Sequence, residues 1–535
     1  MLLTIVIVVY IGILAFLGYL GYTKTKNTSD YYLGGRKVHP VVMALSYGST
    51  FISTSAIVGF GGTAGVFGFS LLWLTFLNIF LGIFIAFIFF GRRTRRIGLN
   101  VQAHTFAELL GKRYQSKFIR KFIAIVIFLF MPIYAAAVMI GGAKFLQIGL
   151  KIDYNIALFV FAIIVATYVF FGGMKTVMYS DAFQGTLMLL GMTILIVAVY
   201  WKLGGISAAH HKLTALFENK AVIEQTAKFQ AGGFQGWTKM PKFMTPNWLT
   251  VVTSIVLGVG IGVLAQPQLA VRFMTVKSDR ELNRAVPIGG FFILMMTGVA
   301  FTVGALTNVF FFEKFGQISV VYAAGADGII PAFIDNFMPS WFLPVFLVTL
   351  LSAGMSTMSS QFHTIGTAVG RDLIGKDDSD PKKAMLVTRA GMLIAIVYTI
   401  AMAFVLPKVW NDSIAISTGL FFGLCAAAFL PMYIGALYFK KLTKTAAITG
   451  MLSGFTASLL WMMFVHTKES MAMKICKFIT GQDSLAITSK ALQFVDPLII
   501  ALSISILVTI VMQIISKKKN QYPAKHIDEC FEGVK

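Results

Sequence analysis

Charged residues are scarce in this chain of 535 residues: they make up 13% of it, against 57% hydrophobic residues. Soluble domains carry about 25% charged residues, so this composition excludes an ordinary soluble globule and predicts a membrane protein with many spanning helices. Acidic residues are scarcer than basic ones, and the net charge is +23. Such an excess indicates nucleic-acid binding only where the basic residues share one surface.

Cysteine and histidine are also rare. The three cysteines, Cys425, Cys476 and Cys530, lie far apart and match neither a metal-binding spacing nor a disulfide framework, which disfavours redox chemistry. Of the seven histidines only His363 lies securely inside an apolar run, so a haem held by two histidines lacks its second ligand. No nucleophile is evidently paired with a base. We therefore expect the protein not to be an enzyme, and keep a membrane enzyme or haem protein as the alternative from another class.

Apolar runs of about 18 residues or more divide the chain into roughly thirteen spans. They cover approximately residues 2–22, 41–69, 70–91, 122–149, 154–173, 181–203, 247–271, 285–312, 342–370, 387–409, 412–438, 445–466 and 493–516. The first run has no basic residues before it and is followed by Lys24 and Lys26, so we interpret it as a retained span and not as a cleaved signal.

Basic residues are concentrated between the spans. If the N-terminus is outside, most of them fall on inner segments, including four arginines between Arg92 and Arg96 and the run Lys517–Lys519. The positive-inside rule therefore predicts an external N-terminus and a cytoplasmic C-terminus. We expect a multi-pass protein of the plasma (inner) membrane. The net charge is then explained by topology and anionic lipid, and no nucleic acid is expected as a partner.

Two spans are predicted to be broken. Residues 41–69 combine a hydroxyl-rich centre with five glycines between Gly59 and Gly68, which is a poor composition for a continuous helix. Residues 247–271 contain three glycines and Pro267, which removes a backbone donor. The two are the second and the seventh of the predicted spans. Interrupted helices in corresponding places are typical of inverted-repeat transporters, because the freed carbonyls and helix ends can bind ions and solute at mid-membrane.

The stretch Leu343–Asp372 is long enough to cross a bilayer and yet carries many hydroxyls. Ala353, Ser356, Thr357 and Ser360 share one helical face, and Ser352 and Ser359 lie beside it. Such a face can hold a bare cation, although small residues also serve to pack membrane helices closely.

Ionisable groups inside the spans are few. Asp181 opens the sixth span and is either a functional acid or an interfacial N-cap. His363 is either a proton site or a hydrogen-bonded packing residue. Lys144, near the outer end of the fourth span, either reaches to the interface or attracts an anionic solute.

Five segments, in order along the chain, resemble the sodium:solute symporter family. They are SDYYLGGR (Ser29–Arg36), HTFAELLGKRY (His104–Tyr114), GGMKTVMYSDAFQ (Gly172–Gln184), AQPQLAVRFMTVKSDRELNRA (Ala265–Ala285), and AGMSTMSS with the GRDL that follows it. The resemblance runs from about Ser29 to at least Ala447. It implies an all-α, LeuT-like fold of about 13 transmembrane helices in a single transporter domain. Its parts would be an extra helix at 1–22, inverted repeats at 41–203 and 247–438 with broken first and sixth core helices, further helices at 445–516 and a cytoplasmic tail at 517–535.

The resemblance also implies a sodium ion held between the first broken span and the hydroxyl-rich stretch. Its ligands would be the backbone carbonyls of Ser49, Ile52 and Ala353 and the hydroxyls of Ser356 and Thr357. Neutral oxygens and carbonyl dipoles are the ligands that a hard cation prefers. Some members bind a second, deeper sodium ion, and this sequence keeps the matching residue types at Asp181, Ser356, Ser359 and Ser360.

In this family the solute binds beside the sodium ion. The candidate contacts are Ser53, Thr54, Ser55 and Ala56 just past the first break, Thr75 and Asn78 on the third span, Tyr134 on the fourth and Gln266 at the second break. Members that carry sugars offer Glu, Asn or Gln on the first broken helix, and proline carriers tend to have an acid where Phe51 stands. These departures disfavour a sugar and a close proline carrier, so we expect a small carboxylate or amino acid.

The predicted function is sodium-driven symport, which imports a small organic solute by alternating access. Sodium ions, the solute and membrane lipid are the expected partners. A proton-coupled symporter of the same fold, using Asp181 and His363, is the first alternative. A sensor fused to a signalling module is another, which the small number of residues after the last span disfavours.

Overall fold

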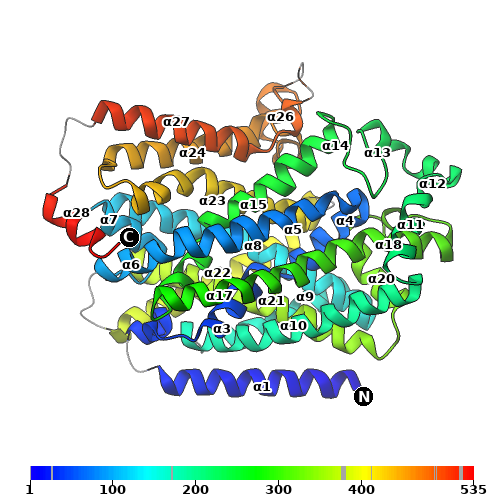
Figure 1. The fold of residues 1–535 in the computed structure, drawn as a ribbon, viewed down its shortest axis with the longest axis horizontal. Helices are drawn as coiled ribbons and strands as arrows, with labels where there is room; N and C mark the ends of the chain where they lie inside the picture. Colours follow the sequence, from blue (N-terminus) through cyan, green and yellow to red (C-terminus); the bar gives the residue numbers. More distant parts are fainter. Residues whose placement is uncertain are drawn as a thin grey trace.

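The computed structural model describes residues 2–25, 28–169, 173–374, 381–410, 413–486, 489, 491–516 and 522–534. The predicted basic run Lys517–Lys519 lies outside these residues. Helices dominate the described chain, and its only strand-like pairing is a single bridge between Val38 and Val276. The long helices run side by side, with α1 at one edge of the molecule and α27 at the opposite edge (Figure 1).

Eleven helices in the described chain are long and apolar enough to cross a membrane. The difference from the thirteen predicted spans has two causes: Ser55–Asn100 forms one continuous run that holds parts of two predicted spans, and the apolar helix Tyr154–Ile164 is short. Eight of the eleven are single continuous helices: α1 (Leu2–Lys24), α8 (Lys117–Leu150), α10 (Met174–Leu203), α21 (Phe342–Thr367), α22 (Pro381–Val409), α23 (Ser413–Tyr438), α24 (Lys444–Phe464) and α27 (Pro497–Ser516). The short apolar helix belongs to α9 (Tyr154–Val169), and the span Pro246–Ala265 is built from several short segments. Two further spans are composite: α5 (Leu72–Ile79), η4 (Phe80–Gly91) and α6 (Arg92–Asn100), then α17 (Asp279–Ile293), η8 (Leu294–Gly298) and α18 (Val299–Phe315).

The first predicted break is confirmed. Helix α3 (Pro40–Phe51) ends at Ile52, which is extended with φ −93° and ψ 101°, and the chain resumes as η2 (Ser55–Phe60) and α4 (Gly61–Phe67). The hydroxyl of Ser53 accepts a bond from the Ser55 backbone N–H at 3.1 Å, so a side chain replaces a helical carbonyl here. Gly62 is required for close packing, because a Cβ there would lie 1.9 Å from the carbonyl oxygen of Ala326.

The second predicted break is also confirmed. The helical run of α14 (Pro246–Leu249), η5 (Thr250–Val259), α15 (Gly260–Gly262) and η6 (Val263–Ala265) ends at Gln266, which is extended with φ −74° and ψ 116°. The chain continues as α16 (Pro267–Ala270) and η7 (Val271–Met274). Pro267 stands at the first position of the new segment, where its missing N–H costs nothing.

The two ends of the helix array differ in character. Helices α6, α7 (Phe106–Arg113) and α28 (Ala524–Phe531) lie at one end, which we call the basic end because α6 alone carries four arginines (Figure 1). The opposite end, the loop end, carries α11 (Ile206–Leu216), α12 (Lys220–Gln225) and α13 (Ala227–Ala231), and on the same side α26 (Ile475–Thr480) lies beyond the ends of α24 and α27 that point away from α28 (Figure 1).

Helix α21 is the central element of the array. It packs against α3, α8, α10 and α22, and nearly all of its residues are buried. Its hydroxyls therefore face protein and not lipid. A polar face is tolerated in such a place, because neighbouring helices supply hydrogen-bond partners that a lipid chain lacks.

Candidate functional site

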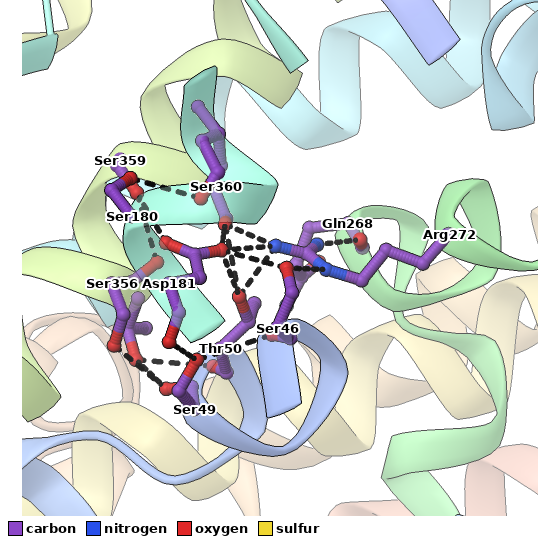
Figure 2. A network of polar contacts seen from close by, with 12 residues as sticks. Ser46, Ser49, Thr50, Ser180, Asp181, Gln268, Arg272, Ser356, Ser359 and Ser360 are labelled. Atoms are coloured by element: carbon purple, nitrogen blue, oxygen red, sulfur yellow. Dashed lines mark hydrogen bonds and ion pairs between the residues drawn. The ribbon is translucent and has the colours of Figure 1, made fainter. Parts of the chain in front are cut away.

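The hydroxyl face of α21 meets the broken end of α3. Ser356 donates a hydrogen bond to the carbonyl of Ser49 at 2.9 Å (Figure 2). Thr357 donates to the carbonyl of Thr50 at 3.1 Å. The Ser356 hydroxyl also lies 3.3 Å from the carbonyl of Ala353 on its own helix. All of these residues are buried. Four of the five predicted sodium ligands are thus brought within hydrogen-bond distance of one another.

The break explains why these carbonyls face side chains. The last turn of a helix has carbonyls without an intrahelical partner, and α3 ends at Phe51. Ile52, the fifth predicted ligand, caps this helix end, and its backbone N–H donates to the Gly48 carbonyl at 2.8 Å. Carbonyl dipoles and hydroxyls without a charged side chain form a donor set that suits a hard monovalent cation.

Asp181 lies deeper, in a fully buried ion pair. Its carboxylate oxygen Oδ2 accepts from Arg272 Nη2 at 2.9 Å, and both partners have fully buried side chains (Figure 2). Further hydroxyls donate to the carboxylate, from Ser46 at 2.9 Å, Thr50 at 3.2 Å, Ser359 at 3.3 Å and Ser360 at 3.3 Å. The residues of the expected second sodium site are therefore assembled, but a guanidinium lies among them.

The interpretation of Asp181 as an interfacial N-cap was wrong. Helix α10 begins at Met174 with Gly173 as its N-cap, so Asp181 lies inside the helix. The sixth span starts earlier than expected because the polar residues before Asp181 are covered by protein. Arg272 was missed, since basic residues near the ends of spans were assigned to membrane topology. Its position five residues after Pro267, on the inner side of a predicted break, was the available signal.

A small cavity adjoins the break in α3. Its volume is about 20 Å³, roughly the room for one water molecule, so the solute path is closed at this point. Four of the eight predicted solute contacts line it: Ser53, Ala56, Asn78 and Tyr134. Residues that were not predicted as solute contacts complete the wall: Phe51, Ile52, Phe60, Leu74, Val259, Thr297, Phe301, Thr418 and Phe422. Phe51 and Ile52 precede Ser53 at the predicted break, whereas the others come from segments far apart in the sequence and are marked by no motif.

The other four predicted solute contacts lie elsewhere. Thr54 donates to the Val138 carbonyl of α8, and the buried Ser55 hydroxyl has no hydrogen-bond partner among the described residues. Thr75 lines a different cavity of about 520 Å³. The side chain of Gln266 donates to its own helix at Gly262, 3.3 Å away, and accepts from Gln268 at 3.1 Å.

The two remaining ionisable candidates have no contact with the ion pair. The ring of His363 is buried and lies 5.6 Å from the Tyr31 ring, and neither ring nitrogen has a hydrogen-bond partner in the described chain. Lys144 forms an ion pair with Asp327 at 3.3 Å, which ties α8 to the segment before α20 (Ile329–Phe337). The cation beside Asp181 is thus Arg272, not a protonated histidine.

The sequence model of the sodium:solute symporter family matches residues 31–454. The chain belongs to this family. It is therefore a multi-pass membrane protein and a sodium-coupled symporter of a small organic solute. Its relatives include sodium/proline symporter 2 of Staphylococcus saprophyticus, which is 28% identical over 482 residues that cover 87% of each chain. The sodium/proline symporter of Staphylococcus aureus is 27% identical, with 86% of each chain covered.

The fold of the symporter matches a solved structure. A sodium-coupled sialic acid symporter in a substrate-bound, outward-open state superposes with a TM-score of 0.73, over 97% of both chains and at 17% identity. At this identity the likeness concerns the fold alone. It confirms the LeuT-like arrangement with two broken core helices.

A larger cavity lies on the loop-end side of the symporter. Its volume is about 530 Å³, and Phe60 lines both this cavity and the small one. His466 and Glu469 form a buried ion pair in its wall, and Asp496 lies near them. Burial opposes protonation of His466, but the Glu469 carboxylate outweighs it and raises the pKa of the imidazole. A volume of about 530 Å³ is large enough to hold a small solute beside the closed cavity.

Ion pairs close the basic end of the symporter. Arg371 Nε bonds Glu108 Oε2 at 2.8 Å, and Arg120 Nε bonds Asp372 Oδ1 at 2.7 Å. They join η10 (Ala368–Leu373), which continues α21, to α7 and α8. Burial opposes ionisation of Glu108, but its bonds with His104 and Arg371 and the charge of Lys112 hold the pKa of this carboxyl well below its usual range.

Proposed function

We propose that this symporter carries a small amino acid inward together with sodium, and that the ion binds where α21 meets the end of α3. The proposed ligands are the carbonyls of Ser49, Ile52 and Ala353 and the hydroxyls of Ser356 and Thr357. The convergence of two hydroxyls on the freed carbonyls of Ser49 and Thr50 is the observation that supports this site. The basic end would face the cytoplasm, following the distribution of arginines.

The lining of the small cavity favours an amino acid over a simple carboxylate. No charged residue is among those that line it, and Ile52 and Ser53 place its wall next to the proposed ion. A solute carboxylate would then be balanced by sodium itself. The buried Oδ1 of Asn78 has no hydrogen-bond partner in the described chain, so an N–H donor of the solute would satisfy it.

The body of the solute would be apolar, because five aromatic rings line the cavity: Phe51, Phe60, Tyr134, Phe301 and Phe422. Proline combines an apolar ring, an N–H donor and a carboxylate, and the relatives from Staphylococcus are named sodium/proline symporters. Proline carriers tend to have an acid at the position of Phe51. Because this chain lacks that acid, other small amino acids remain candidate solutes beside proline.

The deep acid is proposed to act with its arginine instead of with a second sodium ion. Arg272 already supplies a full positive charge to Asp181 and also donates to the Gln268 carbonyl at 2.6 Å. One sodium ion per zwitterionic amino acid would then move one net charge, which is worth about 2.3 kcal/mol per 100 mV of membrane potential.

The test is a thermal-shift screen of the purified symporter against amino acids, monocarboxylates and sugars, each with sodium or with choline. Ligand binding raises the melting temperature by mass action. We expect a shift with L-proline or another small amino acid that is larger in sodium. A shift with acetate or pyruvate of equal size would contradict the role of the solute N–H. Equal shifts in choline and sodium would contradict a sodium ion beside the solute.

A further inference from the structure

The C-terminal helix α28 is docked on the basic end. Asn100, the last residue of α6, donates to the carbonyls of Cys530 at 3.1 Å and Glu532 at 2.9 Å, and Arg96 donates to the carbonyl of Gly533 at 3.2 Å. The carbonyls at the end of a helix lack intrahelical partners, so these side chains complete the end of α28. Cys530 is 1% exposed and Phe531 is 6% exposed. These two residues are therefore buried against the basic end, next to a cavity of about 480 Å³ that is lined by both Asn100 and Cys530.

Arg113 connects this helix to α23. Its guanidinium is fully buried and donates to the carbonyls of Ala436 at 3.3 Å, Phe439 at 3.1 Å and Lys440 at 3.2 Å, where α23 ends. The Cζ atom of the same guanidinium lies over two aromatic rings, 5.1 Å from the ring centre of Phe531 and 5.6 Å from that of Tyr522. Aromatic faces attract a desolvated cation, so the two rings both bind Arg113 and keep water from it.

The helices held together here also line the solute cavity. Helix α6 continues the span that begins with α5, which contributes Asn78 to the cavity. Helix α23 contributes Thr418 and Phe422. The basic ends of the two helices also touch directly, since Arg93 of α6 donates to the Leu437 carbonyl at 2.9 Å. Release of solute at the basic end requires α6 and α23 to separate there. Any contact that holds these two helices together therefore opposes release.

We propose that α28 is a latch on the basic end. When docked, it reinforces the contact of α6 with α23 and slows the opening of the cavity toward this end. Undocking of α28 then accompanies each opening. The latch goes beyond the proposed solute and sodium site, and its action does not depend on which solute is carried.

Cys530 provides a native reporter of the latch. The other two cysteines can be replaced by alanine, which leaves Cys530 as the only thiol. Its alkylation by a water-soluble maleimide, measured on the purified full-length protein, reports undocking. We expect slow alkylation, and an increase of about tenfold in Phe531→Ala, which removes one of the rings over Arg113. Phe478→Ala is the matched control, because Phe478 is 92% exposed at the loop end.

Hydrogen exchange of backbone amides gives the second readout. In Phe531→Ala and in Asn100→Ala we expect faster exchange at the basic ends of α6 and α23, with unchanged exchange at α26. Faster alkylation without faster exchange in α6 and α23 would show that α28 is only packed there, and would overturn the latch. Rapid alkylation of Cys530 in the protein without the Phe531 change would overturn it as well. Both readouts are made without solute, so a wrong assignment of the solute does not affect them.

Discussion

Substitutions in the buried pair of Asp181 and Arg272 are expected to change the stability of the protein and its sodium dependence in different ways. Asp181→Asn leaves a guanidinium buried without its carboxylate, and Arg272→Gln leaves the carboxylate without its cation. Both side chains are fully buried. Removal of one partner of such a pair costs about 3–5 kcal/mol. An unfolding entropy of about 2.1 cal/mol/K per residue gives roughly 1.1 kcal/mol/K for this chain, so each variant should melt about 3–5 °C lower.

The double variant distinguishes a true pair from two independent sites. Asparagine and glutamine can still exchange a hydrogen bond, and no uncompensated charge is left. We expect Asp181→Asn/Arg272→Gln to melt closer to the unmodified protein than the sum of the single changes allows. Melting temperatures are measured in one detergent by intrinsic fluorescence. Strict additivity of the two single changes would refute the coupling.

The same variants test the number of sodium ions. If Arg272 takes the place of a second ion, uptake in proteoliposomes depends on sodium with a Hill coefficient near one, and Asp181→Asn leaves that coefficient unchanged. Arg272→Gln frees the carboxylate and its hydroxyls, and we expect it to raise the coefficient. A fall from about two to about one in Asp181→Asn would show that the acid binds sodium, and would refute the role given to Arg272.

Three further changes probe the cavity, the basic end and the loop end. Asn78→Ala should raise the KM for the solute about 5- to 150-fold, the equivalent of about 1–3 kcal/mol, whereas Thr75→Ala, which alters a different cavity, should leave it unchanged in the same uptake assay. Glu108→Gln should lower the melting temperature at neutral pH. Because the pKa of Glu108 is depressed in the folded protein, its carboxylate stabilises the fold above about pH 4.5, and this stabilisation is lost as the pH falls further. The melting temperatures of the two proteins should therefore converge only in strong acid. Gly62→Ala places a Cβ 1.9 Å from the Ala326 carbonyl oxygen, so we expect this variant to misfold and to aggregate on size-exclusion chromatography. A symmetric peak at the elution volume of the unmodified protein would contradict the close packing at Gly62.

The breaks in two spans could be predicted from the sequence because their causes are local. Pro267 removes a donor, and the glycines with the Ser53 hydroxyl weaken the first helix. The hydroxyl face of α21 follows from helical spacing alone. Local chemistry therefore indicated both halves of the proposed sodium site, and the family resemblance brought them together.

The contents of the cavity and the deep ion pair could not be predicted in the same way. Thr418 and Phe422 reach the cavity because α23 packs beside the break, and the sequence contains no local sign of that packing. Gln266 was expected to face the solute, but its amide bonds to its own helix and to Gln268. Arg272 lies close to the end of a span, where the sequence cannot distinguish a buried ion pair from a topology signal.

The sodium dependence of Ser356→Ala and Thr357→Ala tests the central proposal most directly. Each change removes one hydroxyl oxygen from the proposed ion shell and leaves the backbone carbonyls in place. We expect the sodium concentration for half-maximal uptake to rise about tenfold in each variant, equivalent to about 1.4 kcal/mol, and to stay unchanged in the control Ser503→Ala, whose hydroxyl is bonded within α27. An unchanged sodium requirement in both Ser356→Ala and Thr357→Ala would show that these hydroxyls only pack α21 against α3.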